Sequence, residues 1–480
     1  MRAAYNGDTL GLHEVRRFNN TPLRIADRMY WNVYSLFQEI KWGIEDVAHT
    51  HGNIVSLAVD SWAVDFGLVD SGGHLIDLPR HYRDPRNLIA MREVVQQMGR
   101  DYLFDRTGIQ LNPINTLYQL YAMRKENANL LSVADRLLLI PDLLNFLLCG
   151  EQAAEFTNAT TTQFLNPAGK WDTELLANLG LPVELLPKVA QPGTMLGRIK
   201  DEELRRRFSL AQTKVIHTAS HDTAAAVLSV PHEEQDYVYI SSGTWSLIGT
   251  VVERPFINEI TKQFNLTNEG GVGNYRLLKN VMGLWLVQET QRALQAMNEP
   301  YEIERLVHRA KLAAPFTYLF NPDDTRLLQP KNMPETIRQI CRETNQRDPE
   351  DTGELIRGIF ESLALKYRQV LEELELVTGR RYNTIHIVGG GSQNQLLSQF
   401  TANATQRIIV TGPVEASAMG NALGQLMALG EVSSPGQMAQ LVGHSLEPVS
   451  YSPRDKAMWD SAYENFKRIS AQQAQLSMSI

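Results

Sequence analysis

The sequence has few cysteines and no excess of basic residues. Two cysteines, Cys149 and Cys341, occur in 480 residues, which excludes a disulfide framework and a CxxC pair for metal or redox chemistry. The count still allows one disulfide, although a reducing compartment is the simpler interpretation. Lys and Arg number 46 against 54 Asp and Glu, a net charge of −8. Such a chain lacks the basic face of a general nucleic-acid or anionic-membrane binder.

Long apolar runs and targeting segments are also missing. The most apolar stretch, residues 130–150, is interrupted by Asp135, Arg136 and Pro141, which predicts core helices rather than a membrane span. Residues 1–5 lack the apolar segment of a signal peptide. No GxxxxGK[ST] motif occurs, so a nucleotide would be held without a P-loop. We therefore expect a cytoplasmic protein with no membrane and no nucleic-acid partner.

Apolar strands alternate with helices in both halves of the chain, and the polar segment at residues 231–235 separates the halves. We predict an α/β fold of two domains, residues 1–231 and 232–480, with a ligand-binding cleft between them. The strands on which the site depends are expected at residues 54–59, 215–218, 237–241, 245–252, 385–388 and 408–410. The corresponding helices are expected at residues 222–228, 281–297, 351–378, 394–405 and 415–429.

Ser220-His221-Asp222-Thr223 follows one of these strands and begins a helix of small residues. The carboxyl ends of strands in an α/β sheet are where such sheets bind ligands. Asp222 could there accept a proton from a substrate hydroxyl. Ser and Asp are also preferred helix caps, and from this segment alone capping is the better interpretation.

Two glycine-containing turns could hold phosphate. Gly243 and Thr244 lie at the tip of the hairpin predicted from residues 237–252, where backbone N–H groups and hydroxyls can bind phosphate oxygens. An ordinary hairpin explains the same pattern. The run Gly389 to Gly391 joins a strand to a helix and allows close approach of an anionic ligand to the helix N-terminus. A merely flexible connection would not need three glycines.

Two further passages carry polar side chains that could face a ligand. Asn280, Leu284 and Gln288 would share one face of the predicted helix, so that two amides could touch a ligand; a solvated face is the simpler interpretation. The passage from Asp60 to Asp65 puts two carboxylates and a tryptophan after a buried strand. That combination suits a sugar, with turn chemistry as the alternative.

The order and spacing of these motifs resemble the FGGY family of carbohydrate kinases over nearly the whole chain. The triple glycine and the Gly243 hairpin are typical of the whole family, whereas other passages point to its rhamnulose branch. The passages that carry the resemblance are residues 17–20, 60–65, 157–163, 220–223, 241–246, 267–271, 278–285 and 412–417.

The resemblance implies an actin-like fold whose two domains close on a sugar and ATP. It implies transfer of a phosphoryl group from ATP to the 1-hydroxyl of L-rhamnulose, with Asp222 as general base and Mg²⁺ as charge neutraliser. No metal ligand is assigned, and the chain is expected to be a monomer or weak homodimer. The residues implied for the ketose are Ala63, His221, Asp222, Thr223 and Asn280. Those implied for ATP are Gly243, Thr244, Gln288, Gly389, Gly390 and Gly391.

Two alternatives follow from the same resemblance. The substrate could be another ketose, such as L-fuculose or a pentulose. The chain could also be an impaired relic that only binds sugar, because family members begin with an Asp-bearing strand and a Gly/Ser-rich hairpin. Aligned through Arg17 to Asn20, this chain is expected to begin after that hairpin, and the arm at residues 3–5 is expected to be too short to pair with residues 10–18. A true start upstream of Met1 would explain the same pattern and is the preferred interpretation, because the rest of the active-site pattern is intact.

Overall fold

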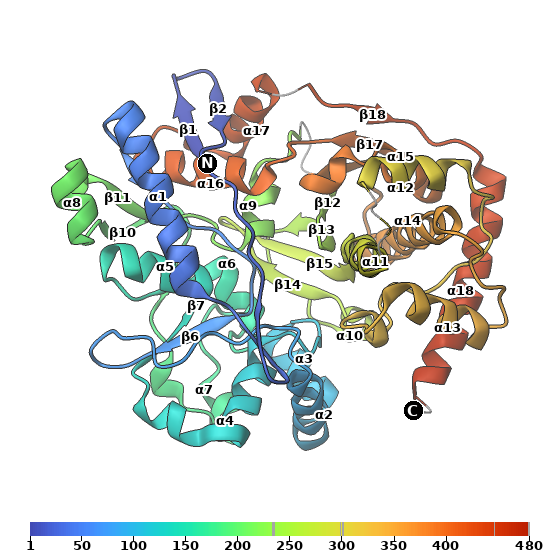
Figure 1. The fold of residues 1–480 in the computed structure, drawn as a ribbon, viewed down its shortest axis with the longest axis horizontal. Helices are drawn as coiled ribbons and strands as arrows, with labels where there is room; N and C mark the ends of the chain where they lie inside the picture. The colour runs from blue at the N-terminus through green and yellow to red at the C-terminus, as the bar shows by residue number, and fades with distance from the viewer. Residues whose placement is uncertain (233–235, 298, 300–301, 446, 479–480) are drawn as a thin grey trace. The chain divides into compact units, whose positions relative to one another are not determined.

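The structure, a computed structural model, describes residues 1–232, 236–297, 299, 302–445 and 447–478. These residues form two compact units (Figure 1). Unit 1 consists of Met1–Glu233, Val251–Leu277 and Glu415–Leu446, and unit 2 of Glu234–Thr250, Leu278–Val414 and Glu447–Ile480. Both units are discontinuous in sequence, whereas the predicted domains are two continuous segments; those domains stay a prediction. Among the described residues, no helix is both long and apolar enough to cross a bilayer.

The central sheet of unit 1 brings two sequence motifs to neighbouring strand ends. Strand β11 (Lys214–His217) pairs antiparallel with β10 (Thr194–Arg198) and parallel with β5 (Ser56–Leu57). Val215 and Ile216 of β11 are fully buried, as the apolar run predicted. Because β5 and β11 run parallel, the residues that follow them leave the sheet at the same edge.

Two helices of unit 1 pack closely because small residues separate them. Helix α9 (Asp222–Leu228) lies against α16 (Ala416–Leu429), and both helices agree with the prediction (Figure 1). A Cβ atom at Gly420 would lie 1.7 Å from the carbonyl oxygen of Ala225, so no larger residue fits there. The packing fixes the beginning of α9, where Asp222 stands.

The chain opens with a paired hairpin. Strands β1 (Arg2–Tyr5) and β2 (Leu10–His13) pair antiparallel along their whole length. The prediction that the first arm is too short to pair is wrong, because the turn begins at Asn6 and leaves four residues on each arm. Leu10 is 2% exposed and packs with Leu423 and other apolar residues of unit 1. The described residues give no evidence of a missing hairpin.

The main sheet of unit 2 is built around β12 (Val238–Ser242). This strand pairs antiparallel with β13 (Trp245–Val252) and parallel with β16 (Thr384–Val388). The strand order is β14 (Thr267–Gly270), β15 (Tyr275–Met282), β13, β12, β16, β17 (Ile408–Thr411) and β18 (Ser450–Tyr451). Strands β13 and β15 run past the boundary of the unit, and β14 belongs to unit 1. Since Ser241 pairs with Val388, the Gly243 turn and the Gly389 loop follow neighbouring strands at the same edge.

One predicted helix begins later in the structure. The segment predicted as a helix over residues 281–297 starts within strand β15 (Tyr275–Met282), and the helix is α11 (Trp285–Ala296). Asn280 therefore lies on a strand and does not share a helical face with Gln288. The apolar residues before the helix join the sheet, which buries their side chains and satisfies their backbone groups.

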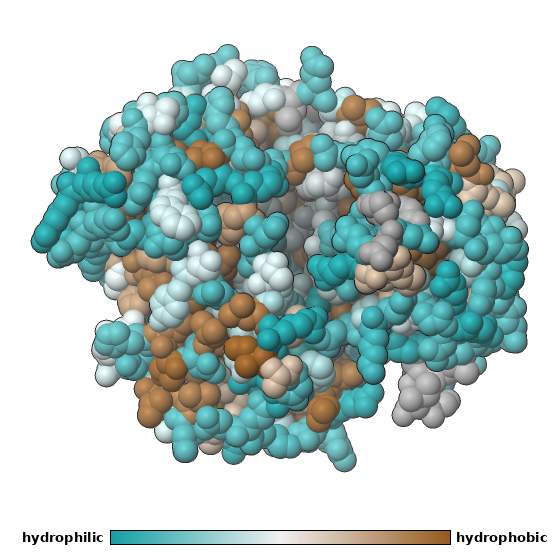
Figure 2. All heavy atoms as spheres, viewed as in Figure 1, coloured by the Kyte–Doolittle hydropathy of each residue, from teal (hydrophilic) through white to brown (hydrophobic). Residues whose placement is uncertain are grey.

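Each unit has further helices and strands, and in Figure 2 apolar side chains gather over part of unit 1, in the region of β6 (Phe66–Val69) and α7 (Thr173–Asn178). In unit 1 they are β3 (Leu23–Ile25), β4 (Arg28–Tyr30), α1 (Val33–His51), β6, α2 (Arg86–Met98), α3 (Arg100–Thr107), α4 (Thr116–Val133), β7 (Arg136–Leu139), α5 (Ile140–Cys149), β8 (Ala154–Glu155), α6 (Phe156–Ala159), α7, β9 (Val189–Ala190), α8 (Glu202–Phe208), α10 (Glu259–Gln263) and α17 (Pro435–His444). In unit 2 they are α12 (Ile303–Leu312), α13 (Met333–Glu343), α14 (Thr352–Thr378), α15 (Gln395–Thr405) and α18 (Lys456–Met478).

Candidate functional site

In unit 1, two predicted motifs meet beyond the ends of β5 and β11. The backbone N–H of Ser61 donates to Ser220 O at 3.0 Å, and the N–H of Asp222 donates to Ser61 O at 2.9 Å. The parallel order of the strands thus joins the Asp60 and Ser220 passages, which are about 160 residues apart in the chain. This junction is the candidate sugar site of unit 1.

Asp222 is the first residue of α9 and its side chain is 44% exposed. Its Oδ1 accepts hydrogen bonds from the backbone N–H of Thr223 at 2.6 Å and from Thr223 Oγ1 at 3.3 Å. The N-cap residue itself, His221, makes no side-chain capping bond. Asp222 therefore contacts the helix N-terminus and still presents carboxylate surface to solvent, so the capping and general-base interpretations are compatible.

Asp60 is the second carboxylate at this junction. Burial raises its pKa to about 6, the hydrogen bond from Asn421 opposes that rise, and the charge of Asp222 adds to it. The two carboxylates thus influence one another, as like charges close together do. Asp60 changes its charge near neutral pH, while Asp222 lies more open to a ligand.

Asp65 holds a turn and does not face a ligand. It is fully buried, and it accepts hydrogen bonds from Trp31 Nε1 at 2.6 Å, Trp62 Nε1 at 3.0 Å and Gln119 Nε2 at 2.9 Å. Burial raises its pKa to about 7. Of the two carboxylates suggested for a sugar in this passage, the structure leaves Asp60 available and occupies Asp65 with protein donors.

Ala63 lies in a tight turn next to a strained residue. The N–H of Asp65 donates to Ala63 O at 2.9 Å, which closes a three-residue turn around Val64. Val64 has a φ of +67°, a conformation that costs a β-branched residue of order 1–3 kcal/mol. Thr116 Oγ1 donates to Val64 O at 2.7 Å and helps hold the turn.

Glu155 is a functional candidate that the sequence did not reveal. Its carboxylate is fully buried and accepts hydrogen bonds from Ser220 N at 3.0 Å, Ser220 Oγ at 2.7 Å and Thr157 Oγ1 at 2.6 Å. Thr157 Oγ1 in turn accepts the N–H of His221 at 3.2 Å. Glu155 thereby fixes the loop that carries Asp222. The passage 157–163 marked this neighbourhood in the sequence, but no local pattern assigned Glu155 a role.

His221 is held by two more residues that sequence reasoning missed, Glu269 and Arg276. Its Nδ1 lies 3.2 Å from Arg276 Nη2 and 3.3 Å from Glu269 Oε2, and its Nε2 lies 3.4 Å from Asp222 Oδ1. His221 itself is 5% exposed. The imidazole is thus a buried neighbour of Asp222 with charged groups at both ring nitrogens.

In unit 2, the triple glycine lies against the Gly243 turn. Gly389 has a φ of +85°, and a Cβ at Gly391 would lie 2.0 Å from Ser242 Oγ. Both positions therefore require glycine, for conformation and for packing against β12. A Cβ at Gly390 would have no neighbour within 4 Å, so Gly390 faces open space.

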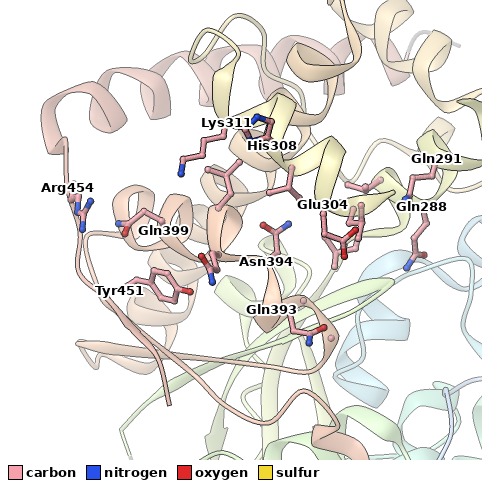
Figure 3. A pocket seen from close by; sticks show the side chains of 18 residues that line it. Gln288, Gln291, Glu304, His308, Lys311, Gln393, Asn394, Gln399, Tyr451 and Arg454 are labelled. Carbon is pink, nitrogen blue, oxygen red and sulfur yellow. The ribbon is translucent and has the colours of Figure 1, made fainter. Parts of the chain in front are cut away.

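Gly390 and Gly391 line a pocket of about 1010 Å³ in unit 2 (Figure 3). Helices α11 and α12 supply apolar lining, with Val287 and Val307 among it, while Gln288 and Asn394 add amides. The volume and mixed lining suit a ligand of nucleotide size. Figure 3 shows Gln288 and Asn394 directed toward the open space between the helices and the glycine loop.

Not every residue predicted to bind ATP lines this pocket. Thr244 Oγ1 donates to Gln288 Oε1 at 3.4 Å, which connects the Gly243 turn to α11. Gly243, Thr244 and Gly389 do not line the pocket, nor does Asn280 on β15. Asn394 was missed as a lining residue, although it follows the triple glycine directly.

No group of three or more His, Cys, Asp or Glu side chains among the described residues has the arrangement of a metal site. A Mg²⁺ ion that arrives with a nucleotide needs few protein ligands, because phosphates and water fill most of its coordination sphere. The residues present therefore fit a nucleotide-borne Mg²⁺.

Comparison with known proteins gives matches over most of the chain. Residues 6–229 match the N-terminal domain, and residues 238–429 the C-terminal domain, of the FGGY family of carbohydrate kinases. A rhamnulokinase from Bacteroides thetaiotaomicron is 40% identical over 460 residues, 95% of this chain and 94% of that protein. A rhamnulokinase from Oceanobacillus iheyensis is 38% identical over 448 residues, 92% of this chain and 93% of that protein.

Solved structures show the same fold. A ligand-bound xylulose kinase from Lactobacillus acidophilus has a TM-score of 0.78 at 19% identity, covering 94% of this chain and 91% of that one. Plasmodium falciparum glycerol kinase with ADP has a TM-score of 0.72 at 13% identity, with the same two coverages, 94% and 91%. The predicted α/β, actin-like fold is thereby confirmed.

Proposed function

The chain belongs to the FGGY family of carbohydrate kinases, which use ATP, and from this we propose that it phosphorylates L-rhamnulose at the 1-hydroxyl. The choice of ketose is supported by the two rhamnulokinases that are 40% and 38% identical to the chain. The products would be L-rhamnulose 1-phosphate and ADP.

Asp222 is proposed as the general base. Its half-exposed carboxylate, at the N-terminus of α9, would accept the proton of the 1-hydroxyl as that oxygen attacks the γ-phosphorus of ATP. The bond from the γ-phosphorus to the bridging oxygen breaks, and ADP leaves. The single observation that carries this proposal is the junction of the Asp60 and Ser220 passages, which presents Asp222 at the edge of the sheet.

The proposed ketose ligands lie around this junction in unit 1, with one further residue in unit 2. Backbone groups of Ala63 in its strained turn, and the hydroxyl of Thr223, supply donors and acceptors of the kind sugar hydroxyls need. His221, whose ring nitrogens face Arg276, Glu269 and Asp222, stays a predicted ligand of the sugar. Asn280 on β15 stays a predicted ligand of the same sugar.

ATP is proposed to bind in the pocket of unit 2. Apolar residues of α11 and α12 would contact the base, and Gln288 would hydrogen-bond the nucleotide. Gly390 and Gly391, at the N-terminal side of α15, leave room for phosphates, with Gly243, Thr244 and Gly389 shaping the same edge of the sheet. Mg²⁺, when bound with ATP, would neutralise phosphate charge, with phosphate oxygens and water as most of its ligands.

An ADP-release assay tests the proposal. We expect turnover with L-rhamnulose, and a larger kcat/KM than with L-fuculose or a pentulose. Asp222→Asn should lower kcat by about 10²-fold or more, since it removes the proton acceptor. Asp70→Asn, at an exposed turn, is the matched control and should keep the wild-type rate.

Other results of this assay would change the assignment. A higher kcat/KM for another ketose would replace the substrate and keep the mechanism. Sugar binding without turnover would contradict the kinase and support a binding relic. Cytoplasmic location and a monomeric or weakly dimeric state stay predictions, the latter checked by analytical ultracentrifugation.

A further inference from the structure

Arg276 is a fully buried cation, and its guanidinium reaches the histidine beside Asp222. Its side chain is 1% exposed, and those of Glu269 and His221 are 4% and 6% exposed. Arg276 Nε donates to Gly270 O at 3.0 Å, which fixes the plane of the guanidinium. All these residues belong to unit 1.

The hydrogens of Arg276 decide which nitrogen of His221 carries the proton. A guanidinium donates and never accepts. Nη2 has two hydrogens and two neighbours, Glu269 Oε2 at 3.1 Å and His221 Nδ1 at 3.2 Å. One hydrogen for each neighbour satisfies both. Nδ1 of His221 then accepts with its lone pair, and the proton of the neutral ring lies on Nε2, 3.4 Å from Asp222 Oδ1.

The opposite tautomer has fewer favourable contacts. With the proton on Nδ1, His221 gains a bond to Glu269, but its N–H then meets the N–H of Arg276, and its bare Nε2 meets the carboxylate of Asp222. A doubly protonated ring also directs an N–H at the guanidinium. The Nε2–H tautomer has one unfavourable contact, with Glu269, whose charge is already paired with Arg276.

We propose that Arg276 is a positioning residue for phosphoryl transfer: it sets the tautomer of His221 so that Nε2–H, and not a bare lone pair, faces Asp222 Oδ1 at 3.4 Å and attracts that carboxylate into its orientation toward the sugar hydroxyl. The inference rests on the proposed function. Asp222 is 44% exposed and its other side-chain bonds go to Thr223, so a donor at Nε2 of His221 restricts its rotation. The charged groups that face this pair are Glu269, Arg276 and Asp60.

The first test reads the tautomer itself and does not depend on activity. In wild-type protein labelled with ¹⁵N-histidine, with His221 assigned by comparison with His221→Gln, we expect the Nε2-protonated neutral ring near neutral pH. In Arg276→Met the ring should change to the Nδ1-protonated or doubly protonated form, because the guanidinium no longer directs an N–H at Nδ1 and the carboxylate of Glu269 lies 3.3 Å from that nitrogen. A wild-type ring protonated on Nδ1 would overturn the proposal, whether or not the variant folds.

The second test is the pH profile of kcat/KM. At high pH, Arg276→Met should lose about 10²-fold relative to wild type, because a bare Nε2 then faces Asp222. As pH falls, protonation of the ring restores Nε2–H, so the variant should recover activity and show a basic limb that wild type lacks. A uniform loss at every pH would indicate a purely structural role and contradict the proposal.

Two variants serve as controls. Glu269→Gln leaves Arg276 donating to Nδ1 of His221, so the pH profile of kcat/KM should keep its shape. A basic limb in this variant alone would mean that Glu269, and not Arg276, sets the tautomer of His221, and would overturn the proposal. Arg407→Met removes a partly buried arginine, bonded to Glu375 at 2.8 Å in unit 2, and should show no new limb. If wild type has no kinase activity, the proposed function fails, whereas the NMR result still decides the tautomer.

Discussion

Asn421 donates its side-chain amide to Asp60 Oδ1 at 2.5 Å and so links helix α16 to the carboxylate that follows β5. The same amide group reaches Ala58 O at 3.2 Å, and Asn421 Oδ1 accepts from Gln425 Nε2 at 2.7 Å. Helix α16, from the C-terminal part of the chain, thereby stabilises the ionised form of the Asp60 carboxylate. This bond opposes the effect of burial, which raises the pKa of Asp60 to about 6.

Asn421→Ala should move the pH dependence of the reaction. Without its donor the pKa of Asp60 rises further, by about one unit for the loss of a hydrogen bond to a charged group. If ionised Asp60 assists the reaction, the acid limb of kcat/KM moves to higher pH by a similar amount. Gln425→Ala keeps the donor to Asp60 and should leave the limb in place. An unchanged limb in Asn421→Ala would mean that Asp60 is not the group that titrates.

Glu155→Gln should lower both stability and kcat. The carboxylate accepts from Ser220 and Thr157, and an amide would turn its NH₂ toward some of these donors, which leaves buried groups unpaired. We expect a loss of about 1–3 kcal/mol in the free energy of unfolding, measured in urea. Steady-state kinetics should show kcat falling more than the sugar KM rises, since the loop that carries Asp222 loosens. Wild-type stability in this variant would contradict the role of Glu155.

Gly390→Ala and Gly391→Ala form a matched pair. A methyl group at Gly391 would collide with Ser242, so this variant should have a lower melting temperature. A methyl group at Gly390 meets no protein atom within 4 Å but narrows the pocket, so this variant should fold normally and show a raised KM for ATP. Calorimetry and ATP titration of both variants check the pair. An unchanged KM in Gly390→Ala would place the phosphates elsewhere.

Asp65 should make the protein less stable as pH rises from about 4 to about 7. Its folded pKa is raised to about 7 by burial, against an unfolded value of about 3.9, so in this window the folded state binds a proton that the unfolded state does not. Three units correspond to roughly 4 kcal/mol as an upper limit. Urea midpoints at the two ends of the window measure the difference, and Asp65→Asn should reduce it. Asp324 provides the opposite case, because it pairs with Arg326 and its pKa is lowered in the folded protein. Asp324→Asn should therefore lower the free energy of unfolding mainly at pH values above the unfolded pKa of Asp324.

The elements with strong local patterns were predictable. Strand β13 has the bounds expected from the sequence, Trp245–Val252, and α14 begins one residue after the expected start at Asp351. The two-residue alternation of a strand and the 3.6-residue period of a helix depend only on which positions carry apolar side chains, so both patterns can be recognised in the sequence. The prediction of a helix that begins at residue 281 was wrong at its start, because residues 281 and 282 belong to strand β15 of the sheet. The helix itself, α11, begins at Trp285.

The candidate site was predictable only in part. Asp222 and the triple glycine stand at strand-to-helix junctions, where parallel strands bring ligand-binding groups to one edge, and this is visible in the sequence. Glu155 and Arg276 carry no such signal. Each acts on residues 55 or more positions away, so only the folded chain shows that they hold the His221–Asp222 pair.

The sequence by itself determined the family, the α/β class and the motifs that carry phosphoryl-transfer chemistry, because these depend on residue type and spacing along one chain. The tertiary structure decided which carboxylates are free and which are occupied: Asp60 and Asp222 meet at a junction of two parallel strands, while Asp65 is buried among tryptophans. It also decided the charged surroundings of His221, because burial and hydrogen-bond partners arise from contacts between distant segments.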